Sequence, residues 1–148
     1  MASTAVRLGK DACLYRNTGS YASPTWDIID NVRDLTLGLE MDGADASIRS
    51  YGGYAADEPT LLRVPVSFNM NYDTADTDWE ALRAAFFGRT AVECLILDRA
   101  TAAGAQGMRA SFKLHKFGRG EPLAGIQTTD VEMKPCIAIN APAWYVGV

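Results

Sequence analysis

The chain has 148 residues, of which 48% are hydrophobic and 22% are charged, and this composition predicts one globular domain spanning residues 1–148. Its net charge is −4 and its basic residues form no cluster, which argues against a protein that binds nucleic acid by neutralising phosphates. No apolar run approaches the roughly eighteen residues that a membrane span needs, and the N-terminus lacks the apolar segment of a signal peptide, so we expect synthesis in the cytoplasm and no membrane partner.

Two weak strand candidates, residues 6–15 and 25–32, precede a clear one. Residues 34–41 alternate between apolar and polar side chains, which predicts a half-buried strand. The alternation returns over residues 62–72, where six apolar side chains in succession share one face: Leu62, Val64, Val66, Phe68, Met70 and Tyr72. Pro65 cannot donate a ladder hydrogen bond, so we expect an edge or a bulge at that point.

The connection between these two strands, at about residues 41–60, reads MDGADASIRSYGGYAADEPT and is far longer than the usual four to six residues. Such a length is typical of a binding loop, a lid or a disordered segment. Its aromatic and charged side chains favour docking on another surface, and its Gly, Ala, Ser and Asp content leaves disorder open. The candidate contact residues are Asp42, Asp45, Arg49, Tyr51, Gly52, Gly53, Tyr54, Asp57 and Glu58.

A short amphipathic helix is predicted at about residues 77–87. Thr77 and Glu80 fit a capping box, and Gly88 is placed to end the helix in a left-handed conformation. Trp79, Leu82 and Phe86 share one face that should pack on a sheet, while Asp78, Glu80 and Arg83 can face water.

Strand patterns follow over residues 91–98, 107–117 and 128–134, with residues 99–106 as a hairpin connection, and a last apolar segment covers 137–146. The pattern predicts a mainly β fold with two packed antiparallel sheets, a β-sandwich or open barrel, and one helix. Trp144 and Tyr145 would either contact a neighbouring subunit or tie down the last strand.

No sequence motif indicates catalysis, a metal site or a cofactor, so we expect none of these. His115 lies among alternating strand residues, and Gly118 and Gly120 favour a turn. The acidic residues around the helix start lack calcium-loop spacing and suit the helix dipole instead: Asp73, Asp76, Asp78 and Glu80. Three widely spaced cysteines, Cys13, Cys94 and Cys136, indicate buried free thiols.

In order, WDIIDNVRDLTL, the long loop leading to an alternating strand, the short helix in NYDTADTDWEALRAAFFGRT and the late EPLAGIQTTDVEMKP resemble phage tail tube proteins. The resemblance covers about residues 10–146. It implies two β-sheets with a helix at one side, and a structural subunit, not an enzyme, that forms hexameric rings stacked into a hollow tube. It also implies a virion tail as the location, other tail proteins at the tube ends and DNA only in transit.

By the same resemblance, one sheet of each subunit would line the channel and the long loop would reach an adjacent subunit or ring. Six chains of charge −4 would carry about −24, which would keep DNA from sticking to the wall. The alternatives are a secretion-machine tube protein of the same fold, a small ligand-binding β-barrel, and a hydrolase using scattered carboxylates. Candidate residues for the channel face, which could equally face the outside solvent, are Asp34, Thr36, Glu40, Ser67, Asn69 and Asn71.

Overall fold

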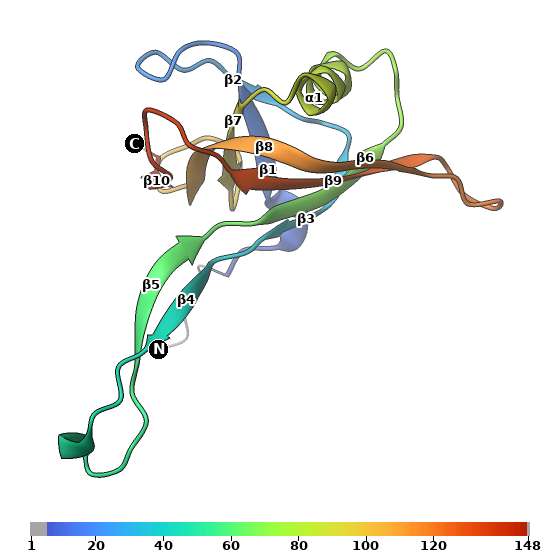
Figure 1. The fold of residues 1–148 in the computed structure, drawn as a ribbon. Helices are drawn as coiled ribbons and strands as arrows, with labels where there is room; N and C mark the ends of the chain where they lie inside the picture. Colours follow the sequence, from blue (N-terminus) through green and yellow to red (C-terminus); the bar gives the residue numbers. More distant parts are fainter. Residues whose placement is uncertain (1–5, 148) are drawn as a thin grey trace.

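The structure is a computed structural model that describes residues 6–147, and within them it contains ten strands and one α-helix (Figure 1). This confirms the mainly β fold with one helix. Two 3₁₀ turns, Gly9–Asp11 and Arg49–Tyr51, are also present. In chain order the elements are β1 (Cys13–Asn17), β2 (Trp26–Ile28), β3 (Val32–Leu37), β4 (Glu40–Asp45), β5 (Asp57–Arg63), β6 (Val66–Asn71), α1 (Thr77–Gly88), β7 (Val92–Leu97), β8 (Gln106–Gly120), β9 (Thr128–Pro135) and β10 (Ala143–Val146).

Eight strands form one antiparallel sheet in the order β2-β1-β7-β8-β9-β6-β3, with β10 also on β8. β2 and β3 stand at opposite ends of this order, yet only residues 29–31 join them. So short a segment reaches about 14 Å at most. Its two ends bond to the two ends of the sheet: Ile29 N donates to Leu14 O of β1 (2.9 Å), and Asn71 N of β6 donates to Asn31 O (3.0 Å). The sheet must therefore curl round until its ends meet, which is the open-barrel form of the expected fold.

The core fills the inside of this curled sheet. The alternation over residues 62–72 correctly predicts that Val64, Val66, Phe68 and Met70 are buried, each with at most 5% exposure. They pack against side chains from the rest of the sheet, including Leu14, Cys94, Ile96, Phe112, Leu114, Val131 and Met133.

Helix α1 covers an open side of the core (Figure 1). Trp79 and Leu82 are buried and Phe86 is partly buried, as predicted, and Trp79 Nε1 donates to Thr129 Oγ1 at 3.0 Å. Two details of the predicted helix ends are wrong. The N-cap is Asp76, whose carboxylate accepts from the Asp78 amide, and the left-handed C-cap is Arg89 (φ 54°) instead of Gly88.

The two long strands predicted at residues 34–41 and 62–72 are each broken in the middle. β3 ends at Leu37 and β6 begins at Val66, while the outer parts become β4 and β5. At the break, Gly38 N donates to Pro65 O at 2.8 Å, and a Cβ on Gly38 would lie 2.9 Å from Pro65 Cγ. Pro65 thus marks the predicted irregularity, and beyond it the two strands leave the sheet together.

In the C-terminal half, β8 is longer than predicted. Gly118 and Gly120 lie within this strand and pair with β9, so the expectation that they form a turn is wrong, and the turn is at residues 121–127. His115 is exposed at a register shift between β8 and β9, which agrees with a surface strand residue.

Candidate assembly surfaces

An arm made of β4, β5 and the tip between them projects away from the sheet (Figure 1). The predicted loop at residues 41–60 is therefore mostly an antiparallel hairpin. Its strands contain Asp, Gly and Pro, which have low strand propensity, so the alternation pattern failed to reveal them. At the tip, Ala46 N donates to Ala56 O at 2.8 Å, and Gly52 and Gly53 adopt positive φ angles of 69° and 82°.

Large apolar and aromatic side chains of the arm are exposed to solvent. Tyr51 and Tyr54 at the tip stand edge to face with ring centres 6.3 Å apart. A lone two-stranded hairpin is marginally stable in water, and both of its edges have unpaired backbone groups. The arm is therefore a surface that gains stability by contact with another surface. Its exposed large side chains are Met41, Ile48, Tyr51, Tyr54, Leu61 and Leu62.

Charged groups on the arm are arranged by strand pairing. Arg63 donates to Asp42 through Nε (3.0 Å to Oδ1) and Nη2 (2.8 Å to Oδ2), and this contact lowers the pKa of Asp42. Asp45 lies directly opposite Asp57. Asp45 Oδ1 accepts from the Ser47 amide at 2.9 Å, and hydrogen bonding with Ser47 lowers the pKa of Asp45.

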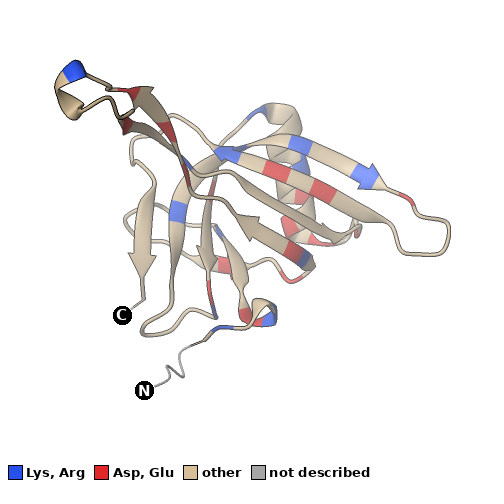
Figure 2. Cartoon of the chain, turned by 90° about the horizontal axis from the view of Figure 1, so that it is seen from below, with Lys and Arg blue, Asp and Glu red and all other residues tan. Residues whose placement is uncertain are grey.

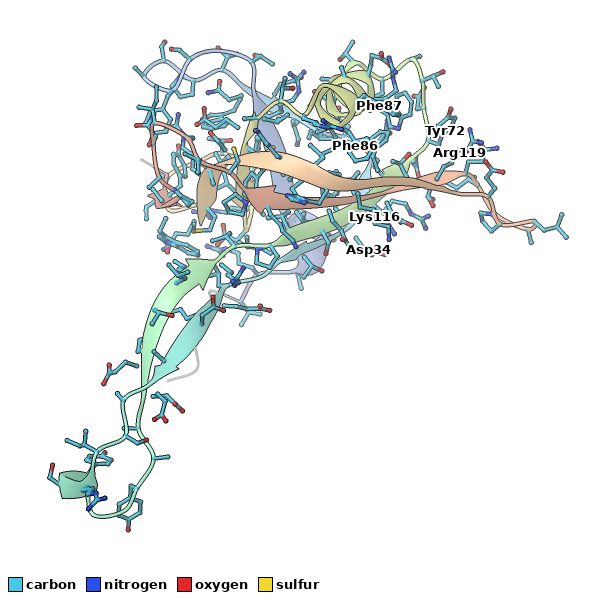
Figure 3. The ribbon with its side chains drawn as sticks, viewed as in Figure 1. Asp34, Tyr72, Phe86, Phe87, Lys116 and Arg119 are labelled. Carbon is cyan, nitrogen blue, oxygen red and sulfur yellow. The ribbon has the colours of Figure 1, made fainter. Side chains whose placement is uncertain are left out.

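A polar face covers the outside of strands β3, β6, β9 and β8. Strand register brings Thr36, Ser67, Glu132 and Lys116 into one row across the four strands. Asn69 Oδ1 accepts from the Asp34 amide at 3.0 Å. A shallow hollow runs across this face and is lined by polar side chains that include Asp34, Thr36, Ser67, Asn69, Lys116, Asp130 and Glu132. Figure 3 labels Asp34 and Lys116 on this side of the sheet.

The polar face thus brings together most of the predicted channel residues, with two differences. Glu40 lies instead at the base of the arm opposite Arg63, because the chain leaves the sheet after Leu37. Asn71 lies at the end of its strand and its side-chain oxygen is buried. Sequence reasoning missed the charged residues that β8 and β9 add to this face, although they alternate with apolar residues in both segments: Lys113, Lys116, Asp130, Glu132 and Lys134.

Further apolar side chains are exposed on the body. Leu123 in the turn after β8 is 105% exposed, and Ile137 and Ile139 between β9 and β10 are 104% and 101% exposed. Phe87 on α1 is 71% exposed, next to the partly buried Phe86 (Figure 3). Water-exposed side chains of this size are typical of surfaces that become covered on assembly.

The two aromatic residues of the last strand, Trp144 and Tyr145, differ in their surroundings, so one suits each of the two roles left open for them. Tyr145 packs against a small second core that includes Tyr15 and Leu95, so it ties down β10. Trp144 is 53% exposed, and its Nε1 donates to Gln106 Oε1 at 3.0 Å. Trp144 is therefore free to contact a neighbour.

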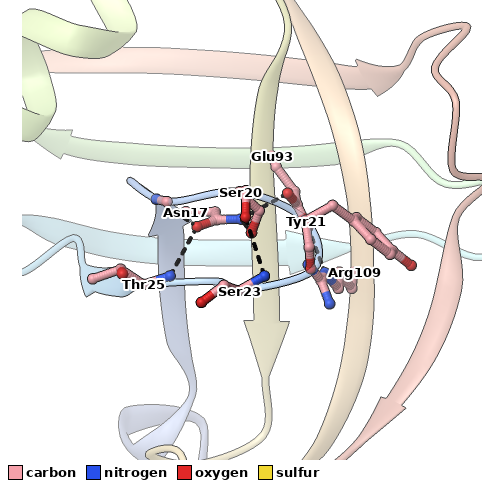
Figure 4. Close-up of polar contacts among 8 residues, drawn as sticks. Asn17, Ser20, Tyr21, Ser23, Thr25, Glu93 and Arg109 are labelled. Atoms are coloured by element: carbon pink, nitrogen blue, oxygen red, sulfur yellow. Dashed lines mark hydrogen bonds and ion pairs between the residues drawn. The ribbon is translucent and has the colours of Figure 1, made fainter.

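The loop between β1 and β2 is held by a network of polar contacts (Figure 4). Asn17 Oδ1 accepts from the amides of Gly19 (2.8 Å) and Thr25 (3.0 Å), and its Nδ2 donates to Glu93 at 2.8 Å. Arg109 forms an ion pair with Glu93, and its guanidinium lies 3.8 Å from the centre of the Tyr21 ring. These contacts fix the loop on the sheet.

An ion pair joins the helix to the sheet. Arg16 of β1 donates to Asp78 Oδ1 from Nη2 at 3.0 Å, and its Nη2 also lies 3.8 Å from Asp27. Asp78 is buried, contrary to the expectation that it faces water, because its carboxylate turns toward the sheet and accepts hydrogen bonds from Arg16 of β1. Burial raises the pKa of Asp78 to about 6, a hydrogen bond with Asp27 acts in the same direction, and Arg16 opposes both.

The described residues contain no group of three or more His, Cys, Asp or Glu side chains that could hold a metal ion. All three cysteines are free thiols; Cys94 is buried, and burial raises its pKa to about 12, whereas Cys13 and Cys136 are only half-buried. Within residues 6–147 no helix is both long and apolar enough to cross a membrane.

No protein-family model and no curated protein matches the sequence, but solved structures match the fold. A chain from the SPP1 tail tube aligns with TM-score 0.76 and 7% identity over 97% of this chain and 81% of its own length. A chain from the tail of an empty gene transfer agent particle with C6 symmetry aligns with TM-score 0.73 and 17% identity, over 97% and 100%.

A third match comes from the sheath-tube complex of an extracellular contractile injection system in its extended state. It has TM-score 0.64 and 6% identity and covers 99% of both chains. At such low identity the agreement lies in the fold. The chain therefore has the fold seen in the SPP1 tail tube, nearly from end to end.

Proposed function

We propose that this chain is the structural subunit of a tail tube, in which rings of six copies stack into a hollow cylinder. The observation that carries the proposal is the match of nearly the whole chain to tail structures, one of them with C6 symmetry. As a ring-forming subunit the chain has a mechanical role in a virion tail and no catalytic one.

The exposed surfaces support assembly into rings and stacks. β2 and β3 each pair on one side only, so each offers a free edge to a neighbour within a ring. Side-by-side pairing would remove these edges, which otherwise invite uncontrolled association. A head-to-tail contact between rings repeats without closing and so builds a filament, and the arm projects from the body as such a contact requires.

In this arrangement the polar face lines the channel. Its acidic residues Asp34, Asp130 and Glu132 are matched by three lysines, so the face carries little net charge. A wall without net positive charge would let DNA pass without binding it. The partners are then other copies of the chain and the tail proteins at the tube ends, with DNA only in transit and no membrane.

A contractile injection system is the second candidate for the assembly, because its tube-containing complex also matches over 99% of both chains. Both candidates require stacked rings. Genes for capsid and DNA packaging beside this gene would favour a virion tail, and genes for an injection machine would favour the second candidate.

The proposal is tested by negative-stain electron microscopy together with light scattering on the purified chain. We expect rings or hollow tubes of large mass. A uniform 16 kDa monomer at high concentration would contradict it and favour a small ligand-binding barrel. Buried side chains fill the inside of the sheet, where such a barrel would hold its ligand, and this argues against the ligand-binding barrel.

A further inference from the structure

Two carboxylates of the same charge face each other on the arm. Asp45 of β4 and Asp57 of β5 are directly opposite in register, and both are exposed. Like charges at such positions repel and destabilise a strand pair. Arg63, the arm's basic residue nearest the body, is paired with Asp42, and within residues 6–147 no cation lies within ion-pair distance of Asp45 or Asp57.

Two lysines face each other on the body in the same way. Lys113 of β8 and Lys134 of β9 are directly opposite in register and exposed on the polar face. In the described part of the chain neither forms an ion pair with a carboxylate. Lys134 lines a notch at the base of the arm together with Glu40, Arg63 and His115.

The acidic pair cannot reach the lysine pair of its own chain. Asp57 lies six residue steps along β5 from Arg63 at the base of the arm, a distance of about 20 Å at strand rise. The arm also points away from the sheet (Figure 1). Figure 2 shows acidic positions on the arm strands well away from the body strands, which carry both basic and acidic positions. A second copy can therefore satisfy both pairs at once.

We propose that Asp45 and Asp57 on the arm of one copy dock on Lys113 and Lys134 of a second copy. This inference rests on the proposed stacking of rings and names the surface that receives the arm. In each contact the two carboxylates, which repel each other, and the two ammonium groups, which repel each other, would come together as a cluster of two negative and two positive charges that attract.

Apolar groups flank both halves of the contact. Met41 lies on the same face of β4 as Asp45, since side chains two residues apart share a face, and it pairs with Leu62. These two side chains are 60% and 54% exposed. On the receiving side, the fully exposed Ile137 follows Lys134 by three residues. The charges would set the register of docking and the apolar side chains would add buried area.

Docking would also affect the channel. Although the polar face carries little net charge as a whole, Lys113 and Lys134 form a local positive site on it, and an arm laid over them would remove this local attraction for DNA phosphates. The arm of each ring would then complete the wall of the next one.

The test is a charge exchange. We compare the wild-type chain with D45K/D57K, K113E/K134E and the combination of all four changes, and measure tube mass by sedimentation and tube length by electron microscopy at low and high salt. We expect each double variant to lose at least tenfold in assembled mass and the combined variant to recover most of it. Glu58→Lys is the matched control, because Glu58 faces the other side of the arm, and it should assemble as the wild type does.

Circular dichroism on each variant checks the fold; K113Q/K134Q replaces K113E/K134E if that variant does not fold, and D45N/D57N replaces D45K/D57K in the same way. Double variants that assemble normally, or a combined variant that stays unassembled, would overturn the inference while tubes of the wild type uphold the proposed function. If K113E/K134E forms normal tubes but binds labelled duplex DNA less, the lysines serve DNA and the inference is wrong. A wild-type chain that forms neither rings nor tubes would overturn the proposed function itself.

Discussion

Arg16 and Asp78 lie 62 residues apart in sequence, yet Arg16 Nη2 is 3.0 Å from Asp78 Oδ1 in a contact that is largely shielded from water. Arg16 belongs to β1 and Asp78 to the first turn of α1, so this ion pair joins the helix to one end of the curled sheet. Its partial burial gives it a larger effect on stability than the ion pairs on the surface.

Replacing Arg16 by Ala should reduce the free energy of unfolding by about 3 kcal/mol, because the Asp78 carboxylate would remain buried without its cation. Urea denaturation followed by circular dichroism measures the effect. Arg83→Ala is the matched control, since Arg83 pairs with Glu80 on the exposed side of the same helix and should change stability little. Equal effects of the two changes would contradict a special role for the buried pair.

Stability should also depend on pH through Asp78. Its pKa is raised to about 6, so the folded chain holds this proton more tightly than the unfolded chain, whose value is about 3.9. The contribution of this group to the free energy of unfolding is therefore full below about pH 4 and is lost as pH rises through about 6.

Asp78→Asn removes this titration, so the difference in stability between the wild type and this variant should change between pH 4 and 6 in that direction. Glu80→Gln is the control, because Arg83 lowers the pKa of Glu80 and its contribution is instead lost as pH falls. A difference between wild type and Asp78→Asn that stays constant from pH 4 to 7 would refute the prediction.

Deleting residues 51–54 at the tip of the arm should leave a folded monomer that no longer forms long tubes. Figure 1 shows the tip lying away from the described part of the body, and the deletion removes both tyrosines and the two positive-φ glycines. Thermal unfolding checks the fold, and electron microscopy measures tube length. Tubes of normal length after the deletion would show that the tip does not take part in stacking.

A buried and an exposed apolar residue of the helix, Leu82 and Phe87, should contribute differently to the stability of the monomer. Leu82 has no solvent exposure, so Leu82→Ala should cost about 3 kcal/mol through lost burial and a cavity. Phe87 is 71% exposed, so Phe87→Ala should leave stability nearly unchanged. Denaturation curves measure both, and a large loss for Phe87→Ala would mean that this side chain supports the monomer fold.

The sequence predicted burial correctly where buried side chains recur at the regular spacing of a strand or a helix. Val64, Val66, Phe68 and Met70 alternate with polar residues, and this pattern predicts their burial. Likewise Trp79 and Leu82 predict the packed face of the helix from their spacing alone. Such patterns are readable because neighbours in sequence set which face each side chain occupies.

Contacts between distant segments were not readable in this way. The burial of Asp78 depends on its contact with Arg16. The point at which the arm leaves the sheet depends on the close approach of Gly38 to Pro65. The arm strands lack alternation because neither of their faces meets the core of the same chain, so the pattern suggested a loop.

By itself, the sequence determined a mainly β domain with one amphipathic helix and a long segment with exposed tyrosines. Only the tertiary structure decided that the sheet curls until its end strands approach each other through residues 29–31 without pairing, and that the long segment is a hairpin arm. Strand register alone placed Asp45 opposite Asp57 and Lys113 opposite Lys134. The physical reason is that side-chain period is local, whereas register comes from hydrogen bonds between strands that are distant in sequence.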